Sequence, residues 1–221
     1  MRLVIFAATG GIGRHLLDQA EAAGHKVTAV ARHPDRLSNA ATAVRADLAT
    51  ATPEELESIV EGADAVLSGL GPRTRGDTGV ASRGTRTIVS AMEATEVRRI
   101  VVVSAAPIGT VAAPGRPTSP RYDPGDGFFM RHLFSPFARV AFGRHYADLA
   151  VMEDLLRGSA LDWTVVRPPR LTNSPITGRY RTAYGRNLPG GWRISRADVA
   201  HCILATVDQP ESVRQVLGIA Y

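Results

Sequence analysis

The sequence predicts an α/β fold in which a doubly wound parallel sheet is covered by helices on both faces. Three observations support this prediction. Apolar, strand-like runs alternate with helical segments along most of the chain. A glycine-rich turn joins the first strand to the first helix. The 221 residues suffice for one sizeable core, so we expect a single domain over residues 1–221.

Six apolar runs are expected to form strands, and five other segments are expected to form helices. The strands are expected at 3–8, 26–31, 43–46, 64–70, 99–105 and 162–168. The helices are expected at 12–23, 53–62, 79–95, 145–157 and 196–207. Strand and helix units of this length indicate parallel strands joined by crossover helices.

A segment at about 107–144 breaks this alternation and is expected to be an inserted loop and helix. Its first part, 107–127, contains five prolines and four glycines. Residues 128–142 follow and hold five of the six phenylalanines. Long loops in compact domains are usually functional or disordered. The phenylalanine-rich stretch is therefore interpreted either as an extra core helix, or as a lid beside the substrate or a homodimer contact.

Composition disfavours several classes of protein. The net charge is +5, but the arginines are scattered and Lys26 is the sole lysine, so nucleic-acid binding is not expected. Apolar runs stay shorter than a membrane helix requires, and a glycine turn follows the opening apolar run, so we expect neither membrane nor secretion, but a cytoplasmic location. Cys202 is the sole cysteine, and it lies in an apolar helical stretch. A core cysteine is expected there, with no disulfide and no metal site.

The strongest functional signal is the loop that follows the first strand, and it contains Thr9, Gly10, Gly11, Ile12 and Gly13. Gly10 lets the backbone turn tightly beside a pyrophosphate, and Gly13 lets the helix pack closely on the strand. Free N–H groups at the helix start would hold the phosphates. This strand–loop–helix unit predicts a dinucleotide-binding Rossmann domain, although an alanine stands where a three-glycine fingerprint begins.

The residues after the second strand indicate which dinucleotide binds. Folds that prefer NAD usually carry an acid at this point to bind the ribose 2′-hydroxyl. Here the strand is followed by Arg32, and Arg36 lies close behind. An arginine can form a bidentate contact with a 2′-phosphate, so NADPH is the expected cofactor, with Arg36 as a second contact.

Three further residues are expected beside the cofactor, namely Asp47, Leu70 and Gly71. Asp47 follows the third strand, where it either accepts from the adenine amino group or caps a simple turn. Leu70 and Gly71 close the fourth strand.

Several stretches resemble the atypical short-chain dehydrogenase/reductase family, namely AATGGIG, AVARHPDRL, GTRTIVSAM, VVVSAAP and LDWTVVRPPRLTNSPITGRY. The resemblance is strongest to the biliverdin-IXβ reductase or flavin reductase group, which also contains NADP-sensing regulators. It covers residues 1 to about 106 and about 145 to 207. It implies hydride transfer from NADPH to a planar small-molecule acceptor.

The resemblance also implies roles for individual residues. Ser104 matches the family's active-site serine, which would donate a hydrogen bond to the substrate or position the nicotinamide amide. Pro168 is implied to lie beside the cofactor. The group has a histidine after its proline pair, and here Arg170 holds that place, where it would anchor an anionic substrate.

Many short-chain dehydrogenases use a Tyr-x-x-x-Lys pair as general acid. In this chain Tyr146 is followed four residues later by Ala150, and the alternative alignment places His145 and Leu149 at the two positions. Alcohol–ketone chemistry is therefore disfavoured, and a flavin, quinone or conjugated tetrapyrrole is favoured, with His145 and Tyr146 as remaining proton donors. A non-catalytic NADP(H) sensor and an epimerase acting on a nucleotide sugar stay open as alternatives.

Overall fold

The computed structural model describes residues 1–37, 42–71, 79–118, 120, 122, 123, 125 and 135–221. For 135–142 it describes the helix but not the side chains. The predicted insertion therefore lies partly outside the described residues. The lid and homodimer interpretations of 128–142 remain predictions.

The centre of the fold is an eight-stranded sheet with the order β3-β2-β1-β4-β5-β6-β10-β8. Its strands, in chain order, are β1 (Arg2–Phe6), β2 (Lys26–Ala31), β3 (Thr42–Arg45), β4 (Ala65–Ser68), β5 (Arg99–Val103), β6 (Asp162–Arg167), β8 (Arg181–Tyr184) and β10 (Gln215–Ala220). All neighbouring pairs are parallel except β10 with β8. The chain leaves β3 at one edge and returns as β4 on the other side of β1. This reversal creates the topological switch point at which doubly wound folds bind ligands.

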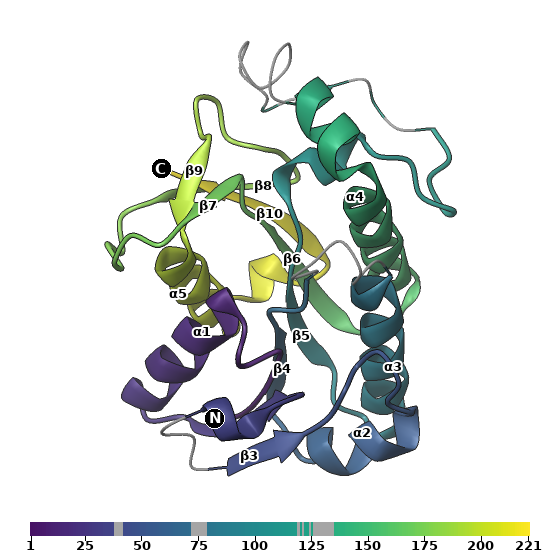
Figure 1. The fold of residues 1–221 in the computed structure, drawn as a ribbon, viewed down its shortest axis with the longest axis vertical. Coiled ribbons are helices and arrows are strands. Elements are labelled where there is room, and N and C mark those ends of the chain that lie inside the picture. The colour runs from purple at the N-terminus through teal and green to yellow at the C-terminus, as the bar shows by residue number, and fades with distance from the viewer. Residues whose placement is uncertain (38–41, 72–78, 119, 121, 124, 126–134) are drawn as a thin grey trace.

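Helices cover both faces of the sheet (Figure 1). On one face, α1 (Gly11–Ala22) packs against α5 (Arg196–Thr206). The other face carries α2 (Pro53–Val60), α3 (Val80–Ala94) and α4 (Ser135–Gly158). A short parallel pair, β7 (Arg170–Thr172) with β9 (Arg193–Ser195), lies outside the main sheet. The doubly wound α/β prediction is confirmed.

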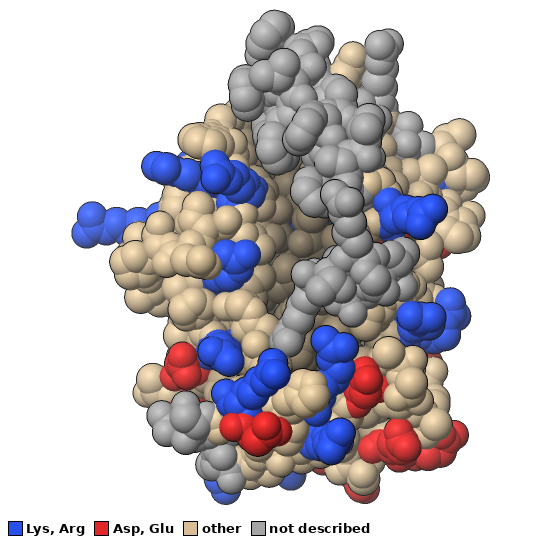
Figure 2. Space-filling model, viewed as in Figure 1, with Lys and Arg blue, Asp and Glu red and all other residues tan. Residues whose placement is uncertain are grey.

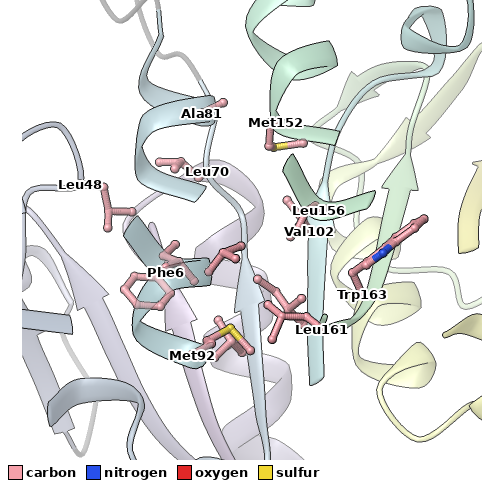
Figure 3. Close-up of a cluster of buried hydrophobic side chains, with 14 of the residues drawn as sticks. Phe6, Leu48, Leu70, Ala81, Met92, Val102, Met152, Leu156, Leu161 and Trp163 are labelled. Atoms are coloured by element: carbon pink, nitrogen blue, oxygen red, sulfur yellow. The ribbon is translucent and has the colours of Figure 1, made fainter. Parts of the chain in front are cut away.

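Alternation of side chains along the strands divides the core into two clusters. In β1, Val4 and Phe6 belong to the cluster beneath α2, α3 and α4, whereas Leu3 and Ile5 belong to the cluster beneath α1 and α5. Successive strand residues point to opposite faces, so a strand that is apolar throughout must be covered on both sides. Figure 3 shows the first cluster, in which Phe6 lies among side chains from strands and helices.

The six predicted strands and the helices at 12–23, 53–62, 79–95 and 196–207 are present, with ends that differ by a few residues. The predicted boundary between the insertion, ending at about residue 144, and a helix beginning at residue 145 was wrong. One 24-residue helix, α4, runs from Ser135 to Gly158 across this point. A single glycine inside a helix costs only about 1 kcal/mol, and so Gly143 does not break it.

The four strands β7 to β10 were not predicted from the sequence. The main sheet is consequently mostly parallel, because its edge strand β8 runs antiparallel to β10. Gly218 in β10 allows a close approach that no other residue permits, since a Cβ there would lie 2.2 Å from the Arg186 carbonyl oxygen.

The described part of the insertion packs into the fold. The short 3-10 helix Ala106–Thr110 is buried throughout. The buried Asp123 carboxylate accepts hydrogen bonds from the backbone N–H groups of Gly125 and Asn187. Among the helices that the structure describes, none is long and apolar enough to cross a membrane.

Candidate functional site

A cleft of about 900 Å³ opens at the carboxyl ends of the central strands. Its walls come from the ends of β1, β2, β4 and β5, and from α1, α4 and the start of α5. In Figure 2 it appears as a hollow between the two helix layers, with Lys and Arg side chains gathered at its lower end. The volume lies in the range of small-molecule and cofactor sites.

The loop between β1 and α1 forms the floor of the cleft, to which Thr9, Gly10, Gly11 and Ile12 all contribute. The Gly10 N–H donates to the Ala7 carbonyl oxygen at 2.8 Å, which closes the turn. Ala7 itself has a φ of 58°, in the left-handed region that favours glycine. This conformation explains why a three-glycine fingerprint has glycine at the position of Ala7.

Gly13 lies behind this loop and does not line the cleft. A Cβ there would lie 2.2 Å from the Ala7 carbonyl oxygen and 2.9 Å from Ala8 Cα. Only glycine lets α1 pack this close to the strand end, which holds the helix N-terminus against the cleft. The loop is therefore shaped to hold a phosphate group.

The basic end of the cleft lies where β2 and β3 finish. Arg32 is exposed and lines the cleft directly after β2. Asp47 also lines it, and its Oδ1 accepts from the Ala49 N–H at 3.1 Å, which is the turn role that the sequence left open. Arg36 lies in an exposed 3-10 turn and does not line the cleft. Leu70 and Gly71 line the neighbouring wall after β4.

A second group of lining residues comes from the far end of the chain and was not predicted from the sequence. Arg196, at the start of α5, donates from Nη1 to Asn173 Oδ1 at 2.6 Å. Its Cδ and Nε lie 2.8 Å from the point that a Gly11 Cβ would occupy, so the side chain crosses over the glycine loop. Arg14 adds a further exposed guanidinium from α1. No local motif connects Gly11 with Arg196, and only the packing of α5 against α1 joins them.

A buried carboxylate, Asp198, fixes the start of α5, whose first residue is Arg196. Asp198 accepts hydrogen bonds from the side chains of Ser195, Thr177 and Tyr221, and from backbone N–H groups of the Thr177 turn. Burial alone would raise the pKa of Asp198, but these hydrogen bonds outweigh it and lower the pKa. The start of α5, and Arg196 with it, is fixed in place.

The opposite end of the cleft is built around Ser104, directly after β5. Ser104 Oγ donates to Glu153 Oε1 at 2.7 Å. Glu153 is fully buried on α4 and also accepts from Arg167 Nε at 2.8 Å, Arg167 Nη2 at 2.5 Å and Arg157 Nη2 at 2.8 Å. Burial would raise the pKa of Glu153, but the two arginines outweigh it and hold the pKa below its ordinary value.

The structure does not bring the other predicted residues of this end into the described lining of the cleft. His145 Nδ1 is buried, with no hydrogen-bond partner among the described residues. Tyr146 packs against the core, and burial raises its pKa. Arg170 is exposed on β7, while Pro168 is buried and accepts from the Ala106 N–H at 2.9 Å. Their roles remain predictions.

Leu149 lines the cleft instead, one helical turn after His145. It holds the place that the alternative alignment gives to the lysine of a Tyr-x-x-x-Lys pair. Together with Val103 and Leu171 it supplies an apolar wall beside Ser104. Across the described part of the chain, no three His, Cys, Asp or Glu residues are grouped as a metal site would require.

The fold and the cleft define a dinucleotide-binding α/β protein. A model of the NAD(P)H-binding family matches residues 7–210, and the chain belongs to this family. Its cofactor is therefore a nicotinamide dinucleotide.

Similar proteins are named for different activities. The chain is 27% identical to the uncharacterized sugar epimerase YhfK of Bacillus subtilis (strain 168), over 99% of this chain and 94% of that protein. The oxidoreductase ylbE of Lactococcus lactis has the same fold, with a TM-score of 0.79 and 22% identity over 100% of this chain and 90% of that one. So does SP1627 of Streptococcus pneumoniae TIGR4, provisionally described as an NADH-flavin reductase, with a TM-score of 0.73 and 24% identity over 100% and 99% of the two chains.

Proposed function

We propose that this protein is an NADPH-dependent oxidoreductase that transfers hydride to a flavin-like, quinone-like or other conjugated small molecule. One observation carries the proposal. The described side chains that line the cleft from β5, α4 and β7 are Val103, Ser104, Leu149 and Leu171, and none of them titrates near neutral pH. A conjugated acceptor fits such a site because it takes hydride without a strong acid from the protein.

Arg32 supports NADPH over NADH. It lines the cleft where β2 ends, and no acid stands there to bind a ribose 2′-hydroxyl. Its guanidinium can bind a 2′-phosphate with two parallel hydrogen bonds.

The chain's own residues bind and orient the cofactor and exclude water. The bound cofactor supplies the hydride. The N–H groups of the Thr9–Gly13 loop would hold the pyrophosphate, and Arg196, whose side chain crosses over this loop, would add a positive charge to it. Ser104 fixes the nicotinamide end, and the apolar wall at Leu149 keeps water from the reacting face.

Two other functions have some support. A non-catalytic NADP(H) sensor would need the same cleft and no proton donor. A nucleotide-sugar epimerase is suggested by the name of YhfK, but oxidising a sugar hydroxyl requires a base, and the described residues that line the cleft from β5, α4 and β7 supply none. The reductase accounts for both the cofactor end and the apolar wall.

Steady-state oxidation of NADPH tests the proposal. FMN, riboflavin and menadione are expected to be reduced, a simple aliphatic ketone is not, and NADH is expected to show a higher KM than NADPH. Tight NADPH binding without turnover of any acceptor would support the sensor. Interconversion of UDP-sugars without net NADPH oxidation would support the epimerase.

A further inference from the structure

We propose that Glu153 is a positioning residue that holds the Ser104 hydroxyl as a hydrogen-bond acceptor facing the cleft, so that this end of the site binds an N–H donor. The donor is either the carboxamide of the nicotinamide or an N–H group of the acceptor substrate. The inference rests on the proposed assignment of the Ser104 end to the nicotinamide.

The hydrogen bond to Glu153 uses the one proton of the Ser104 hydroxyl. A serine hydroxyl has one proton and two acceptor lone pairs. Ser104 gives its proton to Glu153 Oε1 at 2.7 Å. The lone pairs remain, and therefore Ser104 can only accept from a molecule in the cleft.

The Glu153 carboxylate has its acceptor positions filled by hydrogen bonds from its neighbours. An ionised carboxylate is an acceptor only, with about four lone-pair positions. Glu153 receives four hydrogen bonds, one from Ser104, two from Arg167 and one from Arg157. Arg167 is 4% exposed and Arg157 is 31% exposed at the side chain, so one arginine is locked in the interior and the other reaches solvent. Every position on Glu153 is used, and no proton is available for it to return to Ser104.

The Ser104 hydroxyl is fixed in position by the backbone and by its bond to Glu153. The Ser104 backbone N–H donates to the Val166 carbonyl oxygen at 2.8 Å, which extends the pairing of β5 with β6. Turning the hydroxyl toward the cleft would leave a buried carboxylate position unsatisfied, which is costly. A ketone oxygen beside Ser104 Oγ would meet another acceptor, whereas an amide or ring N–H finds its partner. The site thus selects against carbonyl groups and in favour of N–H groups.

Binding of NADP⁺ and of its 3-acetylpyridine analogue tests the first source of the donor. The analogue keeps the carbonyl oxygen and replaces the amide NH₂ by a methyl group. The wild type is expected to bind NADP⁺ on the order of threefold to tenfold tighter than the analogue, measured by calorimetry. Ser104→Ala is expected to lose this preference. The measurement requires no turnover, so it stands even where the proposed reductase activity fails.

Reduction of lumiflavin and of 3-methyllumiflavin tests the second source, because the methyl group removes the ring N–H. A fall of similar size in kcat/KM for the methylated flavin, seen in the wild type and absent in Ser104→Ala, would assign the donor to the acceptor substrate. A preference for the N–H ligand in either the cofactor or the flavin experiment supports the proposal. The proposal would be overturned if, in both experiments, the wild type and Ser104→Ala showed the same ratio between the N–H ligand and its analogue.

Glu153→Gln tests the positioning role. The glutamine amide can donate to Ser104 Oγ and release the serine proton toward the cleft, and so the preference for N–H ligands is expected to vanish although Ser104 is present. Asp154→Asn is the matched control, because the adjacent Asp154 turns away to accept from the Gly115 N–H at 2.7 Å. It is expected to keep the full preference.

A role in folding alone would give a different result. In the Ser104→Ala background, Glu153→Gln is expected to leave the ratio of the two dissociation constants unchanged, although it lowers stability. A further change in that ratio would show that Glu153 acts by another route. Where Glu153→Gln does not fold, Glu153→Asp replaces it, since its shorter carboxylate stays charged for the arginines but recedes from Ser104.

Discussion

The two ends of the cleft are built in opposite ways. At the Arg32 end, an exposed guanidinium lines the cleft directly after β2, and recognition there would depend on charge that solvent can reach. At the Ser104 end, the charge is buried in Glu153 and neutralised by arginines, and Ser104, which lines the cleft, donates its proton to that carboxylate. The first arrangement selects a ligand at little cost to the fold. The arrangement at the Ser104 end fixes the direction of the hydrogen bond from Ser104 to Glu153, and the fold depends on that buried group.

The largest expected effect is at the buried end. Arg167→Leu removes two of the four hydrogen bonds to Glu153 and leaves a buried charge whose remaining partners are Arg157 and the Ser104 hydroxyl. Breaking a buried pair by removing one partner typically costs about 3–5 kcal/mol. Urea denaturation of the variant is expected to show a loss of this size. Arg98→Leu is the control, because Arg98 pairs with Asp162 at 3.6 Å on the surface, and such pairs are worth about 1 kcal/mol or less.

The same variant is expected to reverse the contribution of Glu153 to the pH dependence of stability. In the wild type the folded pKa is lowered, so its contribution is present above the unfolded pKa of about 4.3 and is lost as the pH falls. Without Arg167 burial dominates and raises the folded pKa. The contribution of Glu153 is then present below about pH 4.3 and is lost as the pH rises. The deficit relative to the wild type should be smaller at pH 5 than at pH 8, although Arg157 and the nearby Arg116 moderate it. A deficit independent of pH between 5 and 8 would contradict the expected rise of the folded pKa of Glu153 in the variant.

An effect of intermediate size is expected at the glycine loop, which separates the two ends. Gly13→Ala places a Cβ 2.2 Å from the Ala7 carbonyl oxygen, and relief requires α1 to move away from β1. Overpacking of this kind costs about 1–3 kcal/mol, measured by urea denaturation. Gly143→Ala in α4 is the control, since a Cβ there meets no atom of the described residues within 4 Å. The control should be neutral or gain up to about 1 kcal/mol from helix propensity. Equal effects for both variants would mean that the loop is looser than its geometry indicates.

The sequence predicted the fold where the pattern is local and failed where it depends on distant partners. The apolar runs that became β1, β2, β4, β5 and β6 were recognised because strands covered on both faces have no polar side. The edge strand β8 was missed because its residues are exposed or half-buried and include an arginine and a tyrosine. Its place in the sheet depends on pairing with β10, whose partner residues lie 33 to 39 positions further along the chain.

The same contrast holds for the cleft. The residues 9–13 and Arg32 form short motifs whose chemistry can be read in order, and most of them line the cleft. Glu153 could not be predicted, because it meets Ser104 across 49 residues and Arg167 across 14. A glutamate on an amphipathic helix is ordinarily solvated, and only the packing of α4 on the sheet shows that this one is buried. The sequence therefore identified the exposed end and missed the partner that defines the buried one.

The smallest effect on the stability of the fold is expected at the exposed end, where cofactor binding separates two arginines. Arg32→Ala is expected to weaken NADPH binding by about 2 kcal/mol and to leave NADH binding nearly unchanged, because a charge-assisted contact to the 2′-phosphate is lost. Arg36→Ala is the matched control. Arg36 is exposed and does not line the cleft, so its field is screened by salt, and a loss of about threefold or less is expected at physiological ionic strength. Calorimetric titration of both variants with both cofactors measures the difference. Equal losses of NADPH and NADH affinity in Arg32→Ala would rule out the 2′-phosphate contact. A larger NADPH effect for Arg36 than for Arg32 would move that contact onto the turn after β2.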